Sequence, residues 1–206
     1  KYIFIVVIFV AILVLGFLGF NKMIQEPKES KATNDMFQSQ QYFDKAVNGT
    51  SKDSLFTLAL KGSDGKYGFL DIADVYSGTK AGNLANYYAG IAYLNMKDYS
   101  NAINYLNNFS SDDDVLGPIS MGAIGDAFVQ LEQLEDAFDY YVKAAKLKSN
   151  TYTTPMYLYK AGVIGLKIEK YNDALSFFNQ IKLEFPKSTE AKDVDVFIGK
   201  AEAAIN

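Results

Sequence analysis

The sequence predicts an all-α protein in which one membrane-spanning helix precedes a stack of helical hairpins. Three observations support this prediction. The first twenty residues are almost all apolar, three later segments repeat the same residue types at the same spacing, and the stretches that flank these segments carry apolar residues at helical spacing. A single hairpin cannot bury its apolar face alone, so we expect the repeated segments to stack on one another.

The N-terminal apolar run extends from Tyr2 to Phe20 and contains no charged residue. At about 1.5 Å per residue, a helix of this length spans roughly 28 Å, which is close to the thickness of a hydrocarbon core. The alternative is a cleaved signal peptide, whose apolar region is about 7–15 residues long and ends at small residues. Because this run is longer and ends in Gly-Phe-Asn-Lys, we predict a transmembrane anchor over residues 1–21.

The next residues, 22–34, are polar, mix Lys with Glu and contain Pro27. This composition predicts a short flexible linker. Apolar residues at helical spacing then predict a helix over residues 35–47. Residues 54–60 and 68–76 read as a further, degenerate hairpin, joined by a glycine-containing turn.

Self-comparison of the remaining chain finds three copies of one pattern. Glycine recurs with spacings of 35 and 37 residues, and three other columns keep the same spacings. The columns are Gly90, Gly125 and Gly162; Tyr99, Leu134 and Tyr171; Ala102, Ala137 and Ala174; and Leu106, Tyr141 and Phe178. Four columns in register over three copies indicate three repeated units.

Each copy reads as helix, turn and helix. We expect the glycine to lie where the second helix packs closely on the first, and the alanine to play the same part on the second helix. The large residues of the other two columns would fill the space between the helices, at i, i+3 and i+4 positions. Asp98 and Asn172 are predicted to cap the second helices of the first and third copies.

The order small-Gly-x-x-aromatic, Tyr-x-x-Ala and aromatic resembles the tetratricopeptide repeat, a unit of about 34 residues. Pro186 stands where that family often has proline, whereas tryptophan is absent and Gly165 replaces a large residue. The resemblance implies a right-handed solenoid with clear repeats over residues 83–116, 118–152 and 155–188.

The complete repeat domain is predicted to extend over residues 35–206. Its last segment, residues 190–205, has apolar residues at helical spacing and reads as a terminal capping helix.

Composition excludes several classes of function. The chain has no Cys and no His, which excludes disulfides, Cys/His zinc sites, thiol nucleophiles and imidazole acid–base chemistry. It has no Arg and a net charge of −4, which disfavours nucleic-acid binding. Chemistry by Ser–Lys, Asp/Glu or Tyr is left open in principle, but no catalytic constellation is visible. We therefore predict a protein that is not an enzyme and that uses neither cofactor nor metal.

Two local patterns superficially suggest ligand sites. Asp112, Asp113 and Asp114 are adjacent, so their side chains diverge and lack the spaced loop of a calcium site. We predict a solvated loop with a helix cap there. The glycine-rich segment 62–68 lacks the spacing of a phosphate-binding loop and no strand precedes it, so we predict a turn.

The resemblance to tetratricopeptide repeats implies a partner-binding groove formed by the first helix of each repeat. Alignment to the groove positions selects Tyr87, Ile91 and Leu94 from the first repeat; Gly122, Asp126, Val129 and Gln130 from the second; and Tyr159, Val163, Leu166 and Lys167 from the third. These residues do not match the Lys, Asn and Arg cluster with which some repeats of this family hold a chaperone's terminal carboxylate. A groove of Tyr with aliphatic residues suits an apolar helix or an extended peptide.

An N-terminal anchor, a short linker and helical hairpins resemble the architecture of the YfgM family of bacterial inner-membrane proteins. The resemblance implies an ancillary subunit of the Sec translocon, SecYEG, that pairs with a membrane-anchored periplasmic chaperone. It predicts a single-pass inner-membrane protein whose repeats face the periplasm and bind proteins. The alternatives are an adaptor of another envelope-assembly, secretion or cell-division complex, and an enzyme.

Overall fold

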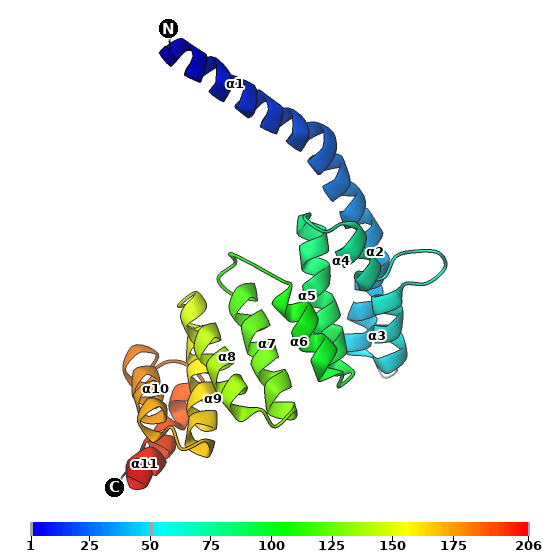
Figure 1. The fold of residues 1–206 in the computed structure, drawn as a ribbon. Coiled ribbons are helices and arrows are strands. Elements are labelled where there is room, and N and C mark those ends of the chain that lie inside the picture. Colours follow the sequence, from blue (N-terminus) through cyan, green and yellow to red (C-terminus); the bar gives the residue numbers. More distant parts are fainter. Residues whose placement is uncertain (1, 50–51, 206) are drawn as a thin grey trace. The chain divides into compact units, whose positions relative to one another are not determined.

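The computed structural model describes residues 2–49 and 52–205, which form helices and turns without any strand. Lys1 of the predicted anchor, and residues 50–51 and 206 of the predicted repeat domain, lie outside the described residues. The chain divides into two compact units, Lys1–Ala89 and Gly90–Asn206. Figure 1 labels their helices, and each unit is described by itself.

The first unit begins with the apolar helix α1, Tyr2–Phe20, in which no residue is buried. The helical segment that starts with α1 has a mean hydropathy of 3.2 in its most apolar window. Among the described residues, it is the one helix long and apolar enough to cross a membrane. This agrees with the predicted single-pass anchor.

The predicted linker is helical, in contrast to the flexible chain that its polarity suggests. A π-helical turn, η1, spans Asn21–Gln25, and helix α2 follows directly over Glu26–Asn48. Pro27 accounts for the wide turn, because it has no N–H to donate to the preceding turn and its ring requires space there. The helical backbone therefore continues from the anchor through residues 22–34 without a break.

The rest of the first unit packs around one aromatic cluster. Helix α3 spans Lys52–Lys61, α4 spans Phe69–Val75, and α5, Lys80–Asn95, begins in this unit. The Phe43 ring of α2 lies 5.6 Å from Phe56, 6.1 Å from Phe69 and 5.0 Å from Tyr88, measured between centroids. These four rings come from α2, α3, α4 and α5, so they tie the helices of the unit together.

The predicted hairpin of residues 54–60 and 68–76 needs a correction. Helices α3 and α4 occur there, and the turn between them contains Gly62 and Gly65 at positive φ. However, α3 packs mainly on α2, and α4 contacts both of these helices. The main helical pair of the first unit is therefore α2 with α3.

In the second unit, each helix packs on the next one along the chain, and α7 also contacts α9. The elements after α5 are α6 (Tyr99–Asn107), α7 (Leu116–Gln130), α8 (Leu134–Leu147), α9 (Thr153–Lys167), α10 (Tyr171–Glu184), a 3₁₀ turn η2 (Glu190–Lys192) and α11 (Val194–Ile205). Val194 and Ala201 of α11 are buried, which fits the predicted capping helix.

The predicted pairing of the glycine column with the large residues of the second helix is confirmed. A Cβ atom on Gly90 would lie 2.5 Å from Leu106 Cγ. The corresponding atom on Gly125 would lie 2.7 Å from Tyr141 Cδ1, and on Gly162 it would lie 2.6 Å from Phe178 Cζ. The same close contact thus occurs in all three copies, and the alanine column is fully buried (Ala102, Ala137 and Ala174).

The turns inside the three copies also share one backbone geometry. Lys97, Glu132 and Glu169, again spaced by 35 and 37 residues, adopt φ values of 62°, 59° and 63°. In each copy the next N–H donates to a carbonyl five residues back, as in a Schellman helix end. The chain is therefore repeat-like in its turns as well as in its packing.

The two predicted helix caps have different outcomes. Asp98 caps α6, since its carboxylate accepts the N–H of Asn101 at 3.3 Å. The prediction for Asn172 is wrong, because α10 begins at Tyr171 and has no side-chain cap. Asn172 lies one residue inside the helix, where its side chain no longer precedes the free N–H groups.

Candidate partner-binding surface

Four of the predicted groove residues line one open pocket in the second unit. They come from the end of α5 and from α7, and residues of the turn before α6, of α6 and of α8 complete the lining. The pocket has a volume of about 450 Å³ and is lined by Leu94, Asn95, Lys97, Tyr99, Asp126, Val129, Gln130 and Tyr141. The predicted members are Leu94, Asp126, Val129 and Gln130.

Asp126 is held in place by groups from two other helices. The Tyr141 hydroxyl of α8 donates a hydrogen bond of 2.5 Å to Asp126 Oδ1. The Lys160 ammonium of α9 donates to the same oxygen at 2.6 Å. Both hydrogen bonds go to Oδ1, and the Asp126 side chain is 41% exposed at the pocket.

The tyrosine rings beside this network are packed closely. Tyr141 and Tyr157 stack with their centroids 6.3 Å apart, and Lys160 Nζ lies 5.4 Å and 5.8 Å from the two rings. Tyr141 is buried, whereas the side chains of Asp126 and Lys160 are more than a third exposed. The ion pair alone is therefore a small stabilising contribution, of about 0–1 kcal/mol.

The environment of Tyr141 opposes its ionisation. Burial raises the pKa of its hydroxyl most, and the charge and hydrogen bond of Asp126 raise it further. The folded state thus keeps Tyr141 in its neutral form, because the hydroxyl must donate a hydrogen bond to Asp126 for the network to exist.

We expect the stability of the chain to fall as the pH rises above 10.0, the ordinary pKa of tyrosine. The Tyr141 pKa is raised in the folded state, so its contribution is complete below the unfolded pKa and is lost as the pH rises towards the folded one. Tyr141→Phe should cost about 1.5–3 kcal/mol at neutral pH and should flatten the alkaline decline. Denaturant unfolding across the alkaline range measures both effects. The exposed Tyr152→Phe is the control, and an equally steep decline in Tyr141→Phe would contradict the expectation.

The other predicted groove residues do not join this pocket. Tyr87 lies in the first unit, where it is half-buried and its ring centroid is 5.9 Å from that of Tyr88. Burial, followed by the neighbouring Tyr88, raises the pKa of Tyr87. Ile91 is half-buried, Val163 packs against the core, and Lys167 is exposed.

Tyr159 lines a second, smaller pocket of about 340 Å³, between α9 and the residues at and after η2. Its ring packs 6.0 Å from Phe178 and 5.2 Å from Phe197. Burial raises the pKa of Tyr159, and the charges of Asp193 and Glu190 add to this. Tyr159 therefore lines a different pocket from Asp126, although Lys160, which donates to Asp126, also lines the pocket of Tyr159.

Gly122 is also not available to a partner. It is buried, and a Cβ atom there would lie 1.9 Å from Tyr157 Cε1. Leu166 likewise packs against the core. Alignment to the repeat family places both residues on the groove face, but the neighbouring helix covers Gly122.

Two residues of the Asp126 network were not among the predicted site residues. The repeat alignment predicts Tyr141 to be a core residue, as the counterpart of Leu106 and Phe178, and it does not place Lys160 among the groove residues. The sequence feature that could have identified Lys160 is that it is the one charged residue of α9 before Lys167. A lone cation on an otherwise apolar helix requires an anionic partner or solvent.

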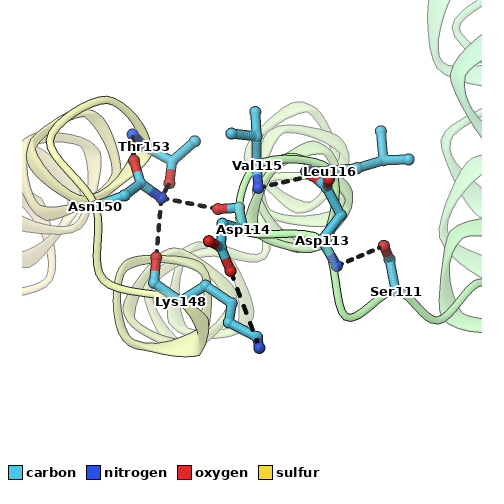
Figure 2. Close-up of polar contacts among 8 residues, drawn as sticks. All are labelled: Ser111, Asp113, Asp114, Val115, Leu116, Lys148, Asn150 and Thr153. Atoms are coloured by element: carbon cyan, nitrogen blue, oxygen red, sulfur yellow. Dashed lines mark hydrogen bonds and ion pairs between the residues drawn. The ribbon is translucent and has the colours of Figure 1, made fainter.

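The aspartates of the loop before α7 form a helix cap, as expected. Asp113 Oδ1 accepts the N–H groups of Val115 and Leu116 at 2.9 Å and 2.7 Å (Figure 2). These two hydrogen bonds lower the pKa of Asp113. Within residues 2–49 and 52–205 there is no cluster of three or more side chains suited to a metal ion.

Comparison with models of known protein families gives no match, and comparison with curated proteins gives no significant match. The resemblances to tetratricopeptide repeats and to the YfgM family therefore stay hypotheses, which depend on residue spacing and on architecture.

Proposed function

We propose that the chain is a membrane-anchored adaptor that binds a segment of another protein in the pocket around Asp126. The observation that carries this proposal is the fixed Asp126 carboxylate at a pocket with an apolar and amide lining. Three helices position that carboxylate, through Tyr141 and Lys160. Such preorganisation reduces the entropy lost on binding.

The lining of the pocket fits a polypeptide better than a small polar metabolite. Leu94 and Val129 offer apolar contact, while the amides of Asn95 and Gln130 can pair with a peptide backbone. The pocket is open rather than enclosed, as a segment of a longer chain requires. Asp126 would favour a segment with a donor group next to an apolar side chain.

The narrower form of the proposal places this adaptor at the periplasmic face of a bacterial inner membrane, as an ancillary subunit of the Sec translocon. The candidate anchor and the repeat-like helices behind it support membrane-bound protein recognition. The choice of SecYEG and an anchored periplasmic chaperone as partners rests on the architectural resemblance alone. An adaptor of another envelope-assembly, secretion or cell-division complex is the alternative.

A photo-crosslinker at Gln130 should capture a defined protein in intact membranes, because this exposed residue lines the pocket. Lys146 of α8, which does not line this pocket, is the matched position for a control crosslinker. Val129→Asp should reduce the capture at Gln130 at least about ten-fold, because it places an unpaired charge on the apolar wall, while far-UV helicity is kept.

The identity of the captured protein tests the narrower form. Translocon subunits or an anchored periplasmic chaperone would support it, whereas subunits of another envelope complex would support the alternative. Labelling of Lys146 by a membrane-impermeant amine reagent only after the cytoplasm is opened would rule out the periplasmic orientation. Equal capture at Gln130 and Lys146 would contradict the pocket as the binding surface.

A further inference from the structure

The first helices of the second and third repeats begin with the same side-chain cap. Asp113 accepts the N–H groups two and three residues ahead, and Asn150 does the same for Tyr152 and Thr153 at 2.8 Å and 2.7 Å. The two caps are 37 residues apart, the same spacing as Gly125 and Gly162. The cap is therefore a repeated feature of the fold.

In the first repeat the preceding loop supplies only part of this cap, since Thr79 Oγ1 accepts the Gly82 N–H at 2.9 Å. The position 35 residues before Asp113 is Gly78, which has no side chain and adopts φ +81°. The two N–H groups that the missing side chain would serve belong to Lys80 and Ala81. They donate instead to Glu29 of α2, to Oε2 at 2.7 Å and to Oε1 at 2.9 Å.

Further contacts join the same face of the helix to the same loop. Gln25 Nε2 donates to the Gly78 carbonyl at 2.9 Å, and Lys28 Nζ donates to the Ser77 carbonyl at 3.1 Å. Six residues after Glu29 on the same helix, Asp35 accepts a hydrogen bond from the Tyr76 hydroxyl. Gln25, Lys28, Glu29 and Asp35 follow helical spacing, so one stripe of the helix next to the anchor makes all these contacts.

The chemistry of the Glu29 contact explains why a carboxylate side chain occurs at this position. The N-terminus of α5 presents unpaired N–H groups and a partial positive charge, which a carboxylate satisfies best. The two oxygens of Glu29 serve two adjacent N–H groups at once, which Asp113 achieves with a single oxygen.

We infer that α2, the helix next to the membrane anchor, couples the anchor mechanically to the start of the first repeat. Its Glu29 side chain supplies the part of the helix cap that the loop of the first repeat lacks, and this contact fixes the anchor to the start of α5. Glu29 is only nine positions after Phe20, or roughly 14 Å of helix. The backbone between them is helical throughout. A tilt or rotation of the membrane helix is thus carried directly to the start of α5, which a flexible linker would not allow.

Hydrogen exchange tests the cap in the full chain in detergent or nanodiscs. In Glu29→Ala the amides of Lys80 and Ala81 should exchange about five-fold faster or more, the effect expected for loss of a helix cap. Glu29→Gln keeps one acceptor and should give a smaller increase. Glu26→Ala, an exposed position on the same helix, is the matched control and should leave both amides unchanged.

Distance measurements test the coupling. The chain has no cysteine, so two spin labels can be introduced alone, at the exposed Lys22 next to the anchor and the exposed Lys80 at the start of α5. We expect one narrow distance distribution in the parent and in Glu26→Ala, and a broad distribution in Glu29→Ala. Unchanged exchange at Lys80 and Ala81, or a broad distribution already in the parent, would overturn the inference. Neither measurement depends on the partner proposed above.

Discussion

Replacing Gly122 by alanine should lower the free energy of unfolding by about 3 kcal/mol, at the upper end of the range for overpacking a core. The new Cβ atom would lie 1.9 Å from Tyr157 Cε1 and 2.1 Å from Tyr157 Cζ. The ring cannot move away cheaply, because it is buried and stacks on Tyr141. Helices α7 and α9 would have to separate, and denaturant unfolding followed by circular dichroism measures the cost.

Gly199→Ala provides the matched control for this substitution. Gly199 lies inside α11, and beyond its chain neighbours and the nearby backbone of its own helix no atom lies within 4 Å of an added Cβ. Alanine there should stabilise the helix by about 0.5–1 kcal/mol. In Gly122→Ala, a second change of Tyr157 to alanine should cost less than it does alone, because the clash is gone. Additive costs of the two changes would refute the contact.

The repeat pattern was predictable because it depends on residues close in the sequence. Gly90 and Leu106 are sixteen positions apart, as are Gly125 and Tyr141. A hairpin with a fixed turn brings such positions together whatever surrounds it. The same reasoning assigned Asn172 to the start of α10 incorrectly. The helix begins one residue earlier, at Tyr171, so Asn172 lies inside it and does not cap it.

The helical linker could not be predicted from local composition. Residues 22–34 are polar, and nothing near them in the sequence is available to pack against. Their partners are the backbone groups of residues 77–81, about fifty positions away. Ala32 and Met36 are buried in the structure. In the sequence, however, two apolar residues among polar ones do not indicate which element packs against them.

The candidate site was predictable in part. Alignment to the repeat placed Leu94, Asp126 and Val129 on one surface, where the structure also has them. The network around Asp126 depends on how α9 lies against α7, which spacing within one repeat does not determine. For the same reason alignment assigned Gly122 to the groove, although Tyr157 of the next repeat covers it.

Asn150 connects two loops that are far apart in the sequence, as Figure 2 shows. Its Nδ2 atom donates to the carbonyl oxygens of Asp114 at 2.8 Å and Lys148 at 2.9 Å, and to Thr153 Oγ1 at 2.7 Å. Its Oδ1 atom accepts the N–H groups that begin α9. The ion pair between Lys148 and Asp114 is long, at 4.0 Å, and exposed, so the amide of Asn150 is the stronger link.

Asn150→Ala should therefore cost about 2–4 kcal/mol, the sum of a lost helix cap and of carbonyl and hydroxyl acceptors left without their donor. Asn150→Asp separates the two contributions, because a carboxylate keeps the cap but cannot donate to the Asp114 and Lys148 carbonyls. We expect this variant to lie between the parent and Asn150→Ala in denaturant unfolding. Asp113→Ala is the matched control, since it removes an equivalent cap that does not link two loops, and about 0.5–2 kcal/mol is expected. If Asn150→Ala costs no more than Asp113→Ala, the bond to Asp114 contributes nothing, and the two loops are held together by the packing of α7, α8 and α9 alone.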